Sequence, residues 1–401
     1  MNQLFRIAAG IAAGLGALLL PVATIAREKA ACCQTRNVIT IIVDGARWEE
    51  VFHGIDPRFL QPEGEGYFRQ PGEPKKLFLE KFWRDSDEAR RAALMPFFWS
   101  TIATDGQLLG DRKAGSTVRL RNGIHISYPG HSEFLTGKAD DARITSNAFK
   151  PNPNVTILEY LQGRPAFKGK VAALSTWDAY PFILNVERSG LPVHSPSHPL
   201  DFAPGNDRVR LLNELLTDTG PSLHSDAITF HLALEYLKEK RPRFLHLSFQ
   251  NADRTAHAGQ YDDYAYALRS TDSYIRRIWE WVQADPAYRN HTTLVVAADH
   301  GRGAASLELW KTHGTPGYKP VGPNEINPTE GDQYSWLAII GPDTPRLGAR
   351  HDIPDVEIAN VTGGIAKLLG ESFAVDAGSE SAMNILMAQS EGKRTKSAGS
   401  E

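Results

Sequence analysis

Residues Asn37–Val43 read NVITIIV and run directly into Asp44 and Gly45. The run is short and rich in β-branched residues, and an Asp-Gly pair is a strong turn signal. A short apolar run with few polar positions is typical of a strand in a parallel sheet that is covered on both faces. We therefore predict that residues 37–43 form a buried parallel strand whose carboxyl end carries Asp44.

Four further runs have the same form, and each stops at a polar or glycine-containing turn. They are residues 170–175 (KVAALS), 243–249 (RFLHLSF), 292–298 (TTLVVAA) and 336–340 (WLAII). Helical patterns lie between them at residues 209–216, 228–237 and 264–282, and in the last of these the apolar residues follow a one-faced helical stripe. The alternation of strands and helices predicts an α/β fold, with a mostly parallel central sheet and helices on both faces.

The first 26 residues have the layout of a secretory signal peptide. Arg6 precedes an apolar run at residues 7–20, Pro21 breaks that run, and small residues follow up to Ala26. An uncleaved membrane anchor is the alternative, because residues 7–25 just reach the length that spans a bilayer. We predict a cleaved signal, and therefore a periplasmic or secreted protein with no membrane-spanning segment once the signal is removed.

The rest of the chain is predicted to be one large domain. Residues 27–36 form a linker, residues 37–389 the domain, and residues 390–401 a polar, disordered tail. Residues 52–95 are rich in glycine, proline and charge, which indicates an insertion after the first strand, either a partial lid over a site or a surface loop. The only cysteines, Cys32 and Cys33, are adjacent and cannot cross-link the fold. A formal net charge of -3 gives no basic excess for binding nucleic acid.

Aspartates follow three of the predicted strands: Asp44, Asp253 and Asp299. In open α/β sheets, ligands bind beyond the carboxyl ends of the strands, so we expect these three residues to converge. A lone aspartate at a strand end is ordinary turn chemistry. Three carboxylates in one place repel each other unless cations neutralise them, and their clustering therefore favours a metal site.

Histidines accompany these aspartates. His257 lies four residues after Asp253, so both side chains share one face if the segment is helical. His300 follows Asp299 directly, and His313 lies in a glycine-rich stretch. Carboxylate and imidazole ligands suit Zn²⁺ or a similar transition metal.

Ser127 is the hydroxyl that such a centre could activate. It lies in ISYPGHSEFLTG, residues 126–137. Two dications facing three carboxylates leave a positive surplus, which favours an ionised hydroxyl and an anionic substrate. A simple helix cap is the alternative role, and the two roles are compatible because a helix N-terminus also favours phosphate.

Together these motifs resemble those of the alkaline phosphatase superfamily, and especially its nucleotide pyrophosphatase/phosphodiesterase-like branch. The likeness runs from about residue 37 to about residue 370. It rests on VDG at Asp44, SYPGHSEFLTG at Ser127, ITSN at Asn147, NADRTAH at residues 251–257, ADHG at residues 298–301 and THG at His313.

The resemblance implies a hydrolase of small-molecule phosphate esters that uses two divalent metal ions, with Zn²⁺ expected and Mn²⁺ or Mg²⁺ as alternatives. Ser127 would be the nucleophile and would form a phosphoseryl intermediate, and Asn147 would donate a hydrogen bond to a phosphoryl oxygen. The implied ligands are Asp253, His257 and His313 for one ion, and Asp44, Ser127, Asp299 and His300 for the other.

Three other functions stay open. A sulfatase is disfavoured because its signature requires arginine where this chain has His131, a residue to which the sequence assigns no role. A monoesterase is disfavoured because related enzymes carry cations where this chain has Trp177, which we predict to contact a phosphodiester substrate. Arg302, beside the metal-binding turn, could supply the missing charge. The third alternative is a non-catalytic binding module that metals stabilise. His246 is interpreted as a core residue.

Overall fold

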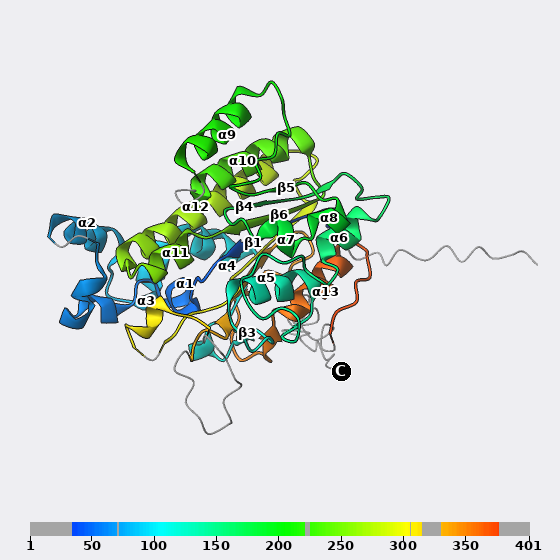
Figure 1. Ribbon diagram of the computed structural model, residues 1–401. Helices are drawn as coiled ribbons and strands as arrows, with labels where there is room; N and C mark the ends of the chain where they lie inside the picture. Colours follow the sequence, from blue (N-terminus) through cyan, green and yellow to red (C-terminus); the bar gives the residue numbers. More distant parts are fainter. Residues whose placement is uncertain (1–33, 70–71, 221–224, 305, 315–329, 377–401) are drawn as a thin grey trace, which may run out of the picture. The chain divides into compact units, whose positions relative to one another are not determined.

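The computed structural model describes residues 34–69, 72–220, 225–304, 306–314 and 330–376. The predicted signal peptide at residues 1–26 and the predicted tail at residues 390–401 lie outside these residues. The described residues belong to one compact unit, and an eight-stranded sheet forms its centre (Figure 1).

The sheet is mostly parallel, as predicted. Its strand order is β10-β2-β9-β7-β1-β6-β4-β5. β1 pairs in parallel with β6 and β7, whereas β9 runs antiparallel to its neighbours β7 and β2. The five predicted strands correspond to β1, β4, β6, β7 and β9, each within one residue at either end. The bounds are β1 Asn37–Val43, β2 Gln107–Leu109, β4 Val171–Ser175, β5 Val193–His194, β6 Phe244–Phe249, β7 Thr292–Ala297, β9 Leu337–Ile340 and β10 Gly348–Ala349.

Helices cover both faces of this sheet, and a second, three-stranded sheet of order β11-β3-β8 was not predicted. Among the described residues, no helix is both long and apolar enough to cross a lipid bilayer. The three strands are β3 Val118–Arg119, β8 Tyr334–Ser335 and β11 Val356–Glu357. The α-helices are α1 Trp48–His53, α2 Glu73–Phe82, α3 Asp87–Leu94, α4 Ala103–Asp105, α5 Ser127–Thr136, α6 Ile157–Gln162, α7 Tyr180–Ile183, α8 Val186–Ser189, α9 Asp207–Thr219, α10 Asp226–Lys240, α11 Asn251–His257, α12 Tyr261–Ala284 and α13 Ala359–Leu368. Shorter helical turns are η1 Pro57–Leu60, η2 Pro62–Tyr67, η3 Phe98–Ile102, η4 Arg112–Ala114 and η6 Leu309–Lys311.

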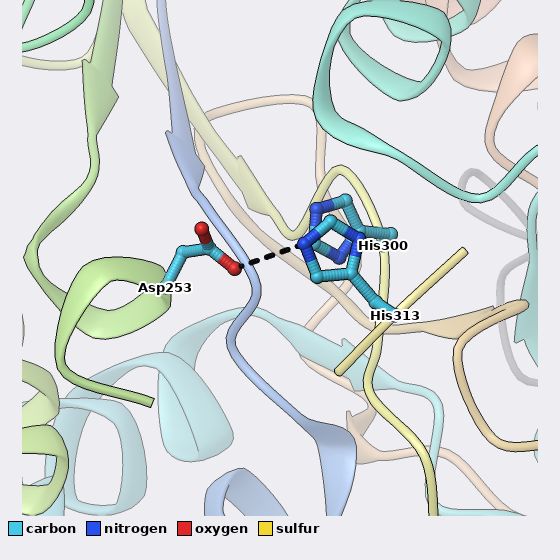
Figure 2. A group of neighbouring side chains, drawn as sticks. All are labelled: Asp253, His300 and His313. Atoms are coloured by element: carbon cyan, nitrogen blue, oxygen red, sulfur yellow. Dashed lines mark ion pairs between the residues drawn. The ribbon is translucent and has the colours of Figure 1, made fainter. Parts of the chain in front are cut away.

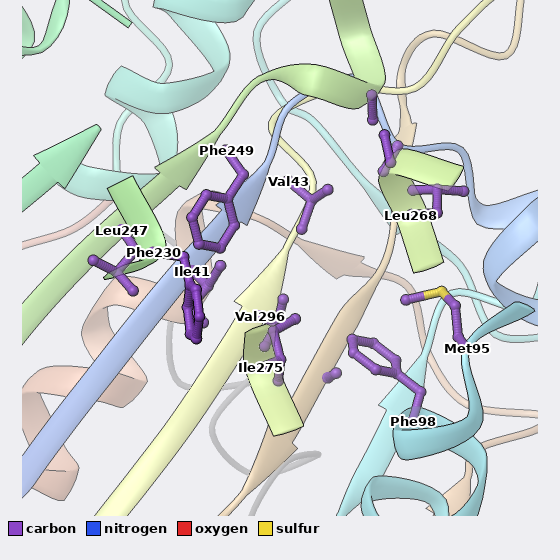
Figure 3. Close-up of a cluster of buried hydrophobic side chains, with 14 of the residues drawn as sticks. Ile41, Val43, Met95, Phe98, Phe230, Leu247, Phe249, Leu268, Ile275 and Val296 are labelled. Atoms are coloured by element: carbon purple, nitrogen blue, oxygen red, sulfur yellow. The ribbon is translucent and has the colours of Figure 1, made fainter. Parts of the chain in front are cut away.

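The side chains of β1 alternate between two apolar cores because successive residues of a strand point to opposite faces. Ile41 and Val43 join a core that includes side chains of α10 and α12 (Figure 3). Val38 and Ile42 join a second core with α5, α6 and α13. Burial on both faces explains why β1 reads as a nearly continuous apolar run.

The segment at residues 52–95 packs into the first core. Its phenylalanines, including Phe59 and Phe78, are buried there. Phe59 stacks on Tyr261 of α12, with ring centroids 3.8 Å apart and planes 8° apart, and meets Trp310 edge-on at 5.0 Å. The segment therefore shares its apolar interior with α12.

Candidate active site

The carboxyl ends of three neighbouring strands carry the aspartates. β7, β1 and β6 are adjacent in the sheet, and Asp299, Asp44 and Asp253 follow them in that order. Gly45 has a left-handed φ of 61°, which glycine adopts without strain. This turn lets the Gly45 N–H donate to Asp299 Oδ1 at 3.0 Å. The three carboxylates therefore converge at one edge of the sheet.

Ser127 is brought to this edge by α5. It is the first residue of that helix, it is 4% exposed, and its Oγ lies 3.3 Å from His300 Nε2. Gly130, one turn along the helix, packs so closely on Asp299 that an added Cβ would overlap its carbonyl oxygen. The positive end of the α5 dipole also favours an anion beside Ser127.

The first group of ligand candidates is Asp44, Ser127, Asp299 and His300. His300 Nε2 lies 3.4 Å from Asp44 Oδ1 and 3.4 Å from Asp299 Oδ2, in addition to its contact with Ser127. These distances are long for charged hydrogen bonds. They match the separation of roughly 3.3–3.4 Å between neighbouring ligands of a tetrahedral Zn²⁺ with bonds of about 2.0–2.1 Å. The group therefore has the spacing of ligands around one ion.

Two acceptor atoms in this group point to the same conclusion. Asp44 Oδ1 and Asp299 Oδ2 are buried and have no hydrogen-bond partner within the described part of the chain. Buried polar atoms of native proteins are nearly always paired, and an ion is one of the partners that resolve an exception. A cation beside His300 Nε2 would satisfy both oxygens.

The second group of ligand candidates is Asp253, His257 and His313. The Nε2 atoms of His257 and His313 lie 3.3 Å and 3.4 Å from the oxygens of Asp253, and 2.9 Å from each other. His313 also stacks on His300, with ring centroids 3.7 Å apart, so the two groups adjoin (Figure 2). The His257 side chain is 47% exposed, so this second group faces solvent.

Backbone carbonyls orient two of the imidazoles. His300 Nδ1 lies 2.8 Å from Gly301 O, and His313 Nδ1 lies 3.1 Å from His125 O. A ring nitrogen that faces a carbonyl carries the hydrogen, and Nε2 is then the nitrogen that can bind an ion. Metal-ligating histidines nearly always have such a partner.

Arg302 lies behind the second group and is fully buried. Its Nε donates to Trp310 O at 2.7 Å, its Nη2 donates to Lys311 O at 2.6 Å, and its Nη1 donates to Asp253 Oδ1. The guanidinium therefore contacts Asp253, two backbone carbonyls and, through Nη2 at 3.3 Å, His257 Nδ1. Arg302 was predicted to lend its charge to the substrate; these contacts direct its donors towards Asp253, His257 and two backbone carbonyls.

His131 joins the first group, although the sequence interpretation gave it no role. Its Nε2 lies 3.6 Å from Asp44 Oδ2 and 3.5 Å from Asp299 Oδ2, and the side chain is fully buried. His131 follows Ser127 by four residues on α5, which places both on one face of the helix. That spacing is the signal in the sequence that could have found it.

The carboxylates of the first group differ in acidity because they share one buried site. Burial and the charge of Asp44 raise the pKa of Asp299 to about 7. Burial and the charge of Asp253 oppose ionisation of Asp44, but hydrogen bonding to His131 and His300 holds its pKa well below the ordinary value. Burial disfavours charge on His300, yet Asp299 and Asp44 outweigh it and raise its pKa to about 10. The group therefore attracts positive charge.

Asn147 and an aromatic edge lie at the rim of the site. Asn147 Oδ1 accepts a hydrogen bond from the Tyr128 N–H at 2.8 Å, which fixes the amide beside the start of α5. The half-buried ring of Trp177 lies 5.7 Å from that of His131 and 6.4 Å from that of Phe149, which is 49% exposed. This edge offers apolar contact area to a bound molecule.

Comparison with known proteins identifies the family and the fold. A sequence model of the type I phosphodiesterase / nucleotide pyrophosphatase family matches residues 53–315, about two thirds of the chain. Murine ectonucleotide pyrophosphatase/phosphodiesterase 5 is similar in structure, with a TM-score of 0.50 and 11% identity over 88% of this chain and 100% of that one. The alkaline phosphatase PafA has a TM-score of 0.50 and 10% identity over 85% of this chain and 96% of that one. No curated protein sequence matches.

Proposed function

Because the chain belongs to the type I phosphodiesterase / nucleotide pyrophosphatase family and hydrolyses phosphate esters, we propose that it does so with two divalent cations and with Ser127 as its nucleophile. One observation carries this proposal. Ser127 Oγ lies 3.3 Å from His300 Nε2, which is itself 3.4 Å from both Asp44 and Asp299. A buried hydroxyl among ligand candidates at this spacing is placed to be ionised by an ion that they hold.

The two groups of ligand candidates would each hold one ion. Imidazole and carboxylate donors favour Zn²⁺, with Mn²⁺ and Mg²⁺ as alternatives. Three carboxylates face two dications, so the loaded site keeps a positive surplus that attracts an anionic ester. When bound, the ions would lower the pKa of the serine hydroxyl and neutralise charge on the phosphoryl and leaving oxygens.

The residues of the chain perform the remaining steps. Ser127 Oγ attacks phosphorus in line, the bond between phosphorus and the leaving oxygen breaks, and a phosphoseryl ester forms. Water then attacks phosphorus, the bond to Oγ breaks, and Ser127 is restored. Asn147 Nδ2 donates to a non-bridging oxygen, where it stabilises developing charge.

Phosphodiesters are the substrates that this site favours over monoesters. A monoester carries an additional negative oxygen, and Arg302 is committed to Asp253 instead of facing the substrate. Trp177 and Phe149 offer apolar surface where the second ester group of a diester would lie. We therefore assign Trp177 to substrate binding and expect small-molecule diesters to be hydrolysed faster than monoesters.

The protein is proposed to act outside the cytoplasm, in the periplasm or as a secreted enzyme. This proposal rests on the signal-like pattern of residues 1–26. Sequencing of the N-terminus of protein recovered from the native host tests it. A mature chain that begins near residue 27 supports export, and a chain that retains residues 1–26 contradicts cleavage.

The nucleophile is tested with Ser127→Ala. Bis-p-nitrophenyl phosphate and p-nitrophenyl phosphate are assayed with and without chelator, metal content is measured by mass spectrometry, and the phosphoenzyme is trapped by acid quenching. We expect the variant to lose turnover and the trapped phosphate while metal binding at the second group persists. The matched control is Ser100→Ala, which removes an exposed hydroxyl and should behave as wild type.

Two outcomes would contradict the proposal. Undiminished turnover by Ser127→Ala would exclude the covalent step. Wild-type protein shown to hold two ions but inactive on both esters would favour the non-catalytic binding module. Faster cleavage of the monoester would leave the nucleophile in place and reverse the substrate assignment.

A further inference from the structure

A chain of four buried polar side chains runs from the core to the first group of ligand candidates. Thr40 Oγ1 on β1 lies 2.8 Å from His246 Nδ1 on β6. His246 Nε2 lies 2.8 Å from the hydroxyl of Tyr180 on α7, and that hydroxyl lies 2.8 Å from His131 Nδ1 on α5. All four side chains are 0% exposed. The far nitrogen of His131 then faces Asp44 and Asp299.

Close packing alone does not explain why these four buried side chains are polar. Thr40 pairs in register with His246, and it lies on the same face of β1 as Val38 and Ile42, which belong to the second apolar core. Polar side chains in such a place are destabilising unless each is hydrogen-bonded. Apolar side chains would fill the same space without the free-energy cost of burying polar groups. The hydrogen bonds therefore point to a role other than packing.

The hydrogen-bonded series has one direction in which the hydrogens of Thr40, His246 and Tyr180 each have an acceptor. Among the described residues, His246 Nδ1 is the hydrogen-bond partner of Thr40 Oγ1. If His246 Nδ1 carried the hydrogen, the hydroxyl hydrogen of the buried Thr40 would lack an acceptor there, so we assign Thr40 as the donor. His246 then carries its hydrogen on Nε2 and donates to Tyr180, and the hydroxyl of Tyr180 donates to His131 Nδ1. His131 is left with its hydrogen on Nε2, facing the carboxylates.

The buried environment keeps the middle of the chain neutral, as this direction requires. Burial lowers the pKa of His246 well below its ordinary value. Burial raises the pKa of the Tyr180 hydroxyl well above its ordinary value. Each therefore keeps one hydrogen to donate and one acceptor to offer.

We propose that Thr40, His246 and Tyr180 fix His131 as a positioning residue, which presents an N–H at Nε2 to the outer oxygen of Asp44. Asp44 Oδ2 lies 3.6 Å from His131 Nε2 and accepts from Gln250 Nε2 at 3.4 Å, while Asp44 Oδ1 lies 3.4 Å from His300 Nε2. An N–H that faces Oδ2 favours the carboxylate orientation in which Oδ1 is turned towards the ion, and positioning partners of this kind typically change metal affinity by about 10–100-fold. This inference rests on the proposed function, because it assumes that Asp44 holds an ion.

The experiment measures metal affinity separately from activity. Metal-free full-length protein is titrated with Co²⁺ against a chromophoric chelator, and visible absorption identifies the site that fills. His131→Leu removes the N–H donor, and Tyr180→Phe removes the hydroxyl that joins His246 to His131. Each should raise the Co²⁺ dissociation constant of one of two sites by about 10–100-fold. His131→Gln keeps an N–H donor near the position of Nε2 and should stay within a few-fold of wild type.

A matched control separates this effect from loss of a buried hydrogen bond. Tyr288 is also buried, and its hydroxyl donates to Pro242 O at 2.6 Å, far from the site in the fold. Tyr288→Phe should lower the melting temperature about as much as Tyr180→Phe and leave both Co²⁺ affinities unchanged. Melting temperatures recorded for all variants identify any that fail to fold.

Asp44→Asn distinguishes failure of this inference from failure of the proposed function. If wild-type protein and Asp44→Asn take up the same number of ions, Asp44 holds none and the proposed function fails. If Asp44→Asn loses one ion but His131→Leu and Tyr180→Phe titrate as wild type, the four hydrogen-bonded side chains only stabilise the fold, and only this inference is overturned. Equal losses for His131→Gln and His131→Leu would also overturn it, because His131 would then be a direct ligand.

Discussion

Replacing Arg302 with methionine should strongly destabilise the metal-free protein. The guanidinium is fully buried and donates to Asp253 Oδ1, to Trp310 O at 2.7 Å and to Lys311 O at 2.6 Å. Methionine has nearly the same length but no donor. The variant therefore leaves the Asp253 carboxylate, which is 13% exposed, without its arginine partner and two carbonyls without a hydrogen bond.

The magnitude follows from these lost partners. Breaking a buried ion pair by removing one partner costs about 3–5 kcal/mol, and each unsatisfied buried carbonyl adds about 1 kcal/mol or more. We expect a total of about 5 kcal/mol. The unfolding entropy of a unit of this size is roughly 0.7 kcal/mol per kelvin, from about 2.1 cal/mol/K per residue, so the melting temperature should fall by about 7 °C.

The assay is thermal unfolding followed by circular dichroism in excess chelator, so that no cation compensates Asp253. Arg276→Met is the control, because Arg276 is 46% exposed and pairs with Glu280 on the surface of α12. Loss of that surface pair should change the melting temperature by less than about 1 °C.

The double variant Asp253→Asn, Arg302→Met provides the refuting result. Removing both charges leaves no uncompensated charge in the interior, so its loss of stability should be smaller than the sum of the two single losses by about 2 kcal/mol or more. Losses that simply add to within about 0.5 kcal/mol would show that the two side chains are not coupled, and the reasoning would be refuted.

Three further perturbations test the geometry. Asn147→Asp keeps the oxygen that accepts from Tyr128 N but loses the amide donor and adds a negative charge. The kcat/KM on a chromogenic diester should therefore fall by about 100-fold or more at unchanged metal content. A smaller loss would show that Asn147 does not contact the phosphoryl group. Gly130→Ala would push α5 away from Asp299, which should lower the free energy of unfolding by about 1–3 kcal/mol and also lower kcat/KM. Gly66→Ala is the control, because no atom lies within 4 Å of the added methyl group, and it should change neither quantity. Burial raises the pKa of Asp272 from 3.8 to about 6 in the folded protein, so its contribution to stability is present at low pH and is lost as pH rises through about 6. Urea unfolding of wild type and Asp272→Asn should therefore show a stability difference that shifts in favour of the variant by roughly 3 kcal/mol between about pH 4 and about pH 8, and a constant difference would contradict the pKa shift.

The central strands could be predicted from sequence because their burial leaves a local mark. β1 is covered on both faces, so an apolar run with a turn signal at its end identified Asn37–Val43 without knowledge of its neighbours. The second sheet left no such mark. Its strands β3, β8 and β11 have two residues each, too few for any periodicity, and they exist because the chain brings them together.

The candidate site could also be predicted only in part from the sequence. The sequence predicted that three aspartates converge, because the carboxyl ends of parallel strands meet at one edge: Asp44, Asp253 and Asp299. The contact between His131 and Tyr180 joins residues 49 positions apart on two helices, and no local spacing encodes it. The burial of Arg302 is likewise decided by tertiary packing, since the loop at Trp310 and Lys311 supplies its acceptors.

The central place of β1 constrains how a nascent chain can fold. The first strand to be synthesised pairs with β6 and β7, which follow about 200 and 250 residues later. Until those strands arrive, a seven-residue strand that is wholly buried in the finished protein has neither of its neighbours. Pairings so distant in sequence slow folding and prolong the exposure of aggregation-prone surface. We therefore expect a fragment that ends before Phe244 to leave β1 without its neighbours and to aggregate more readily than the full chain.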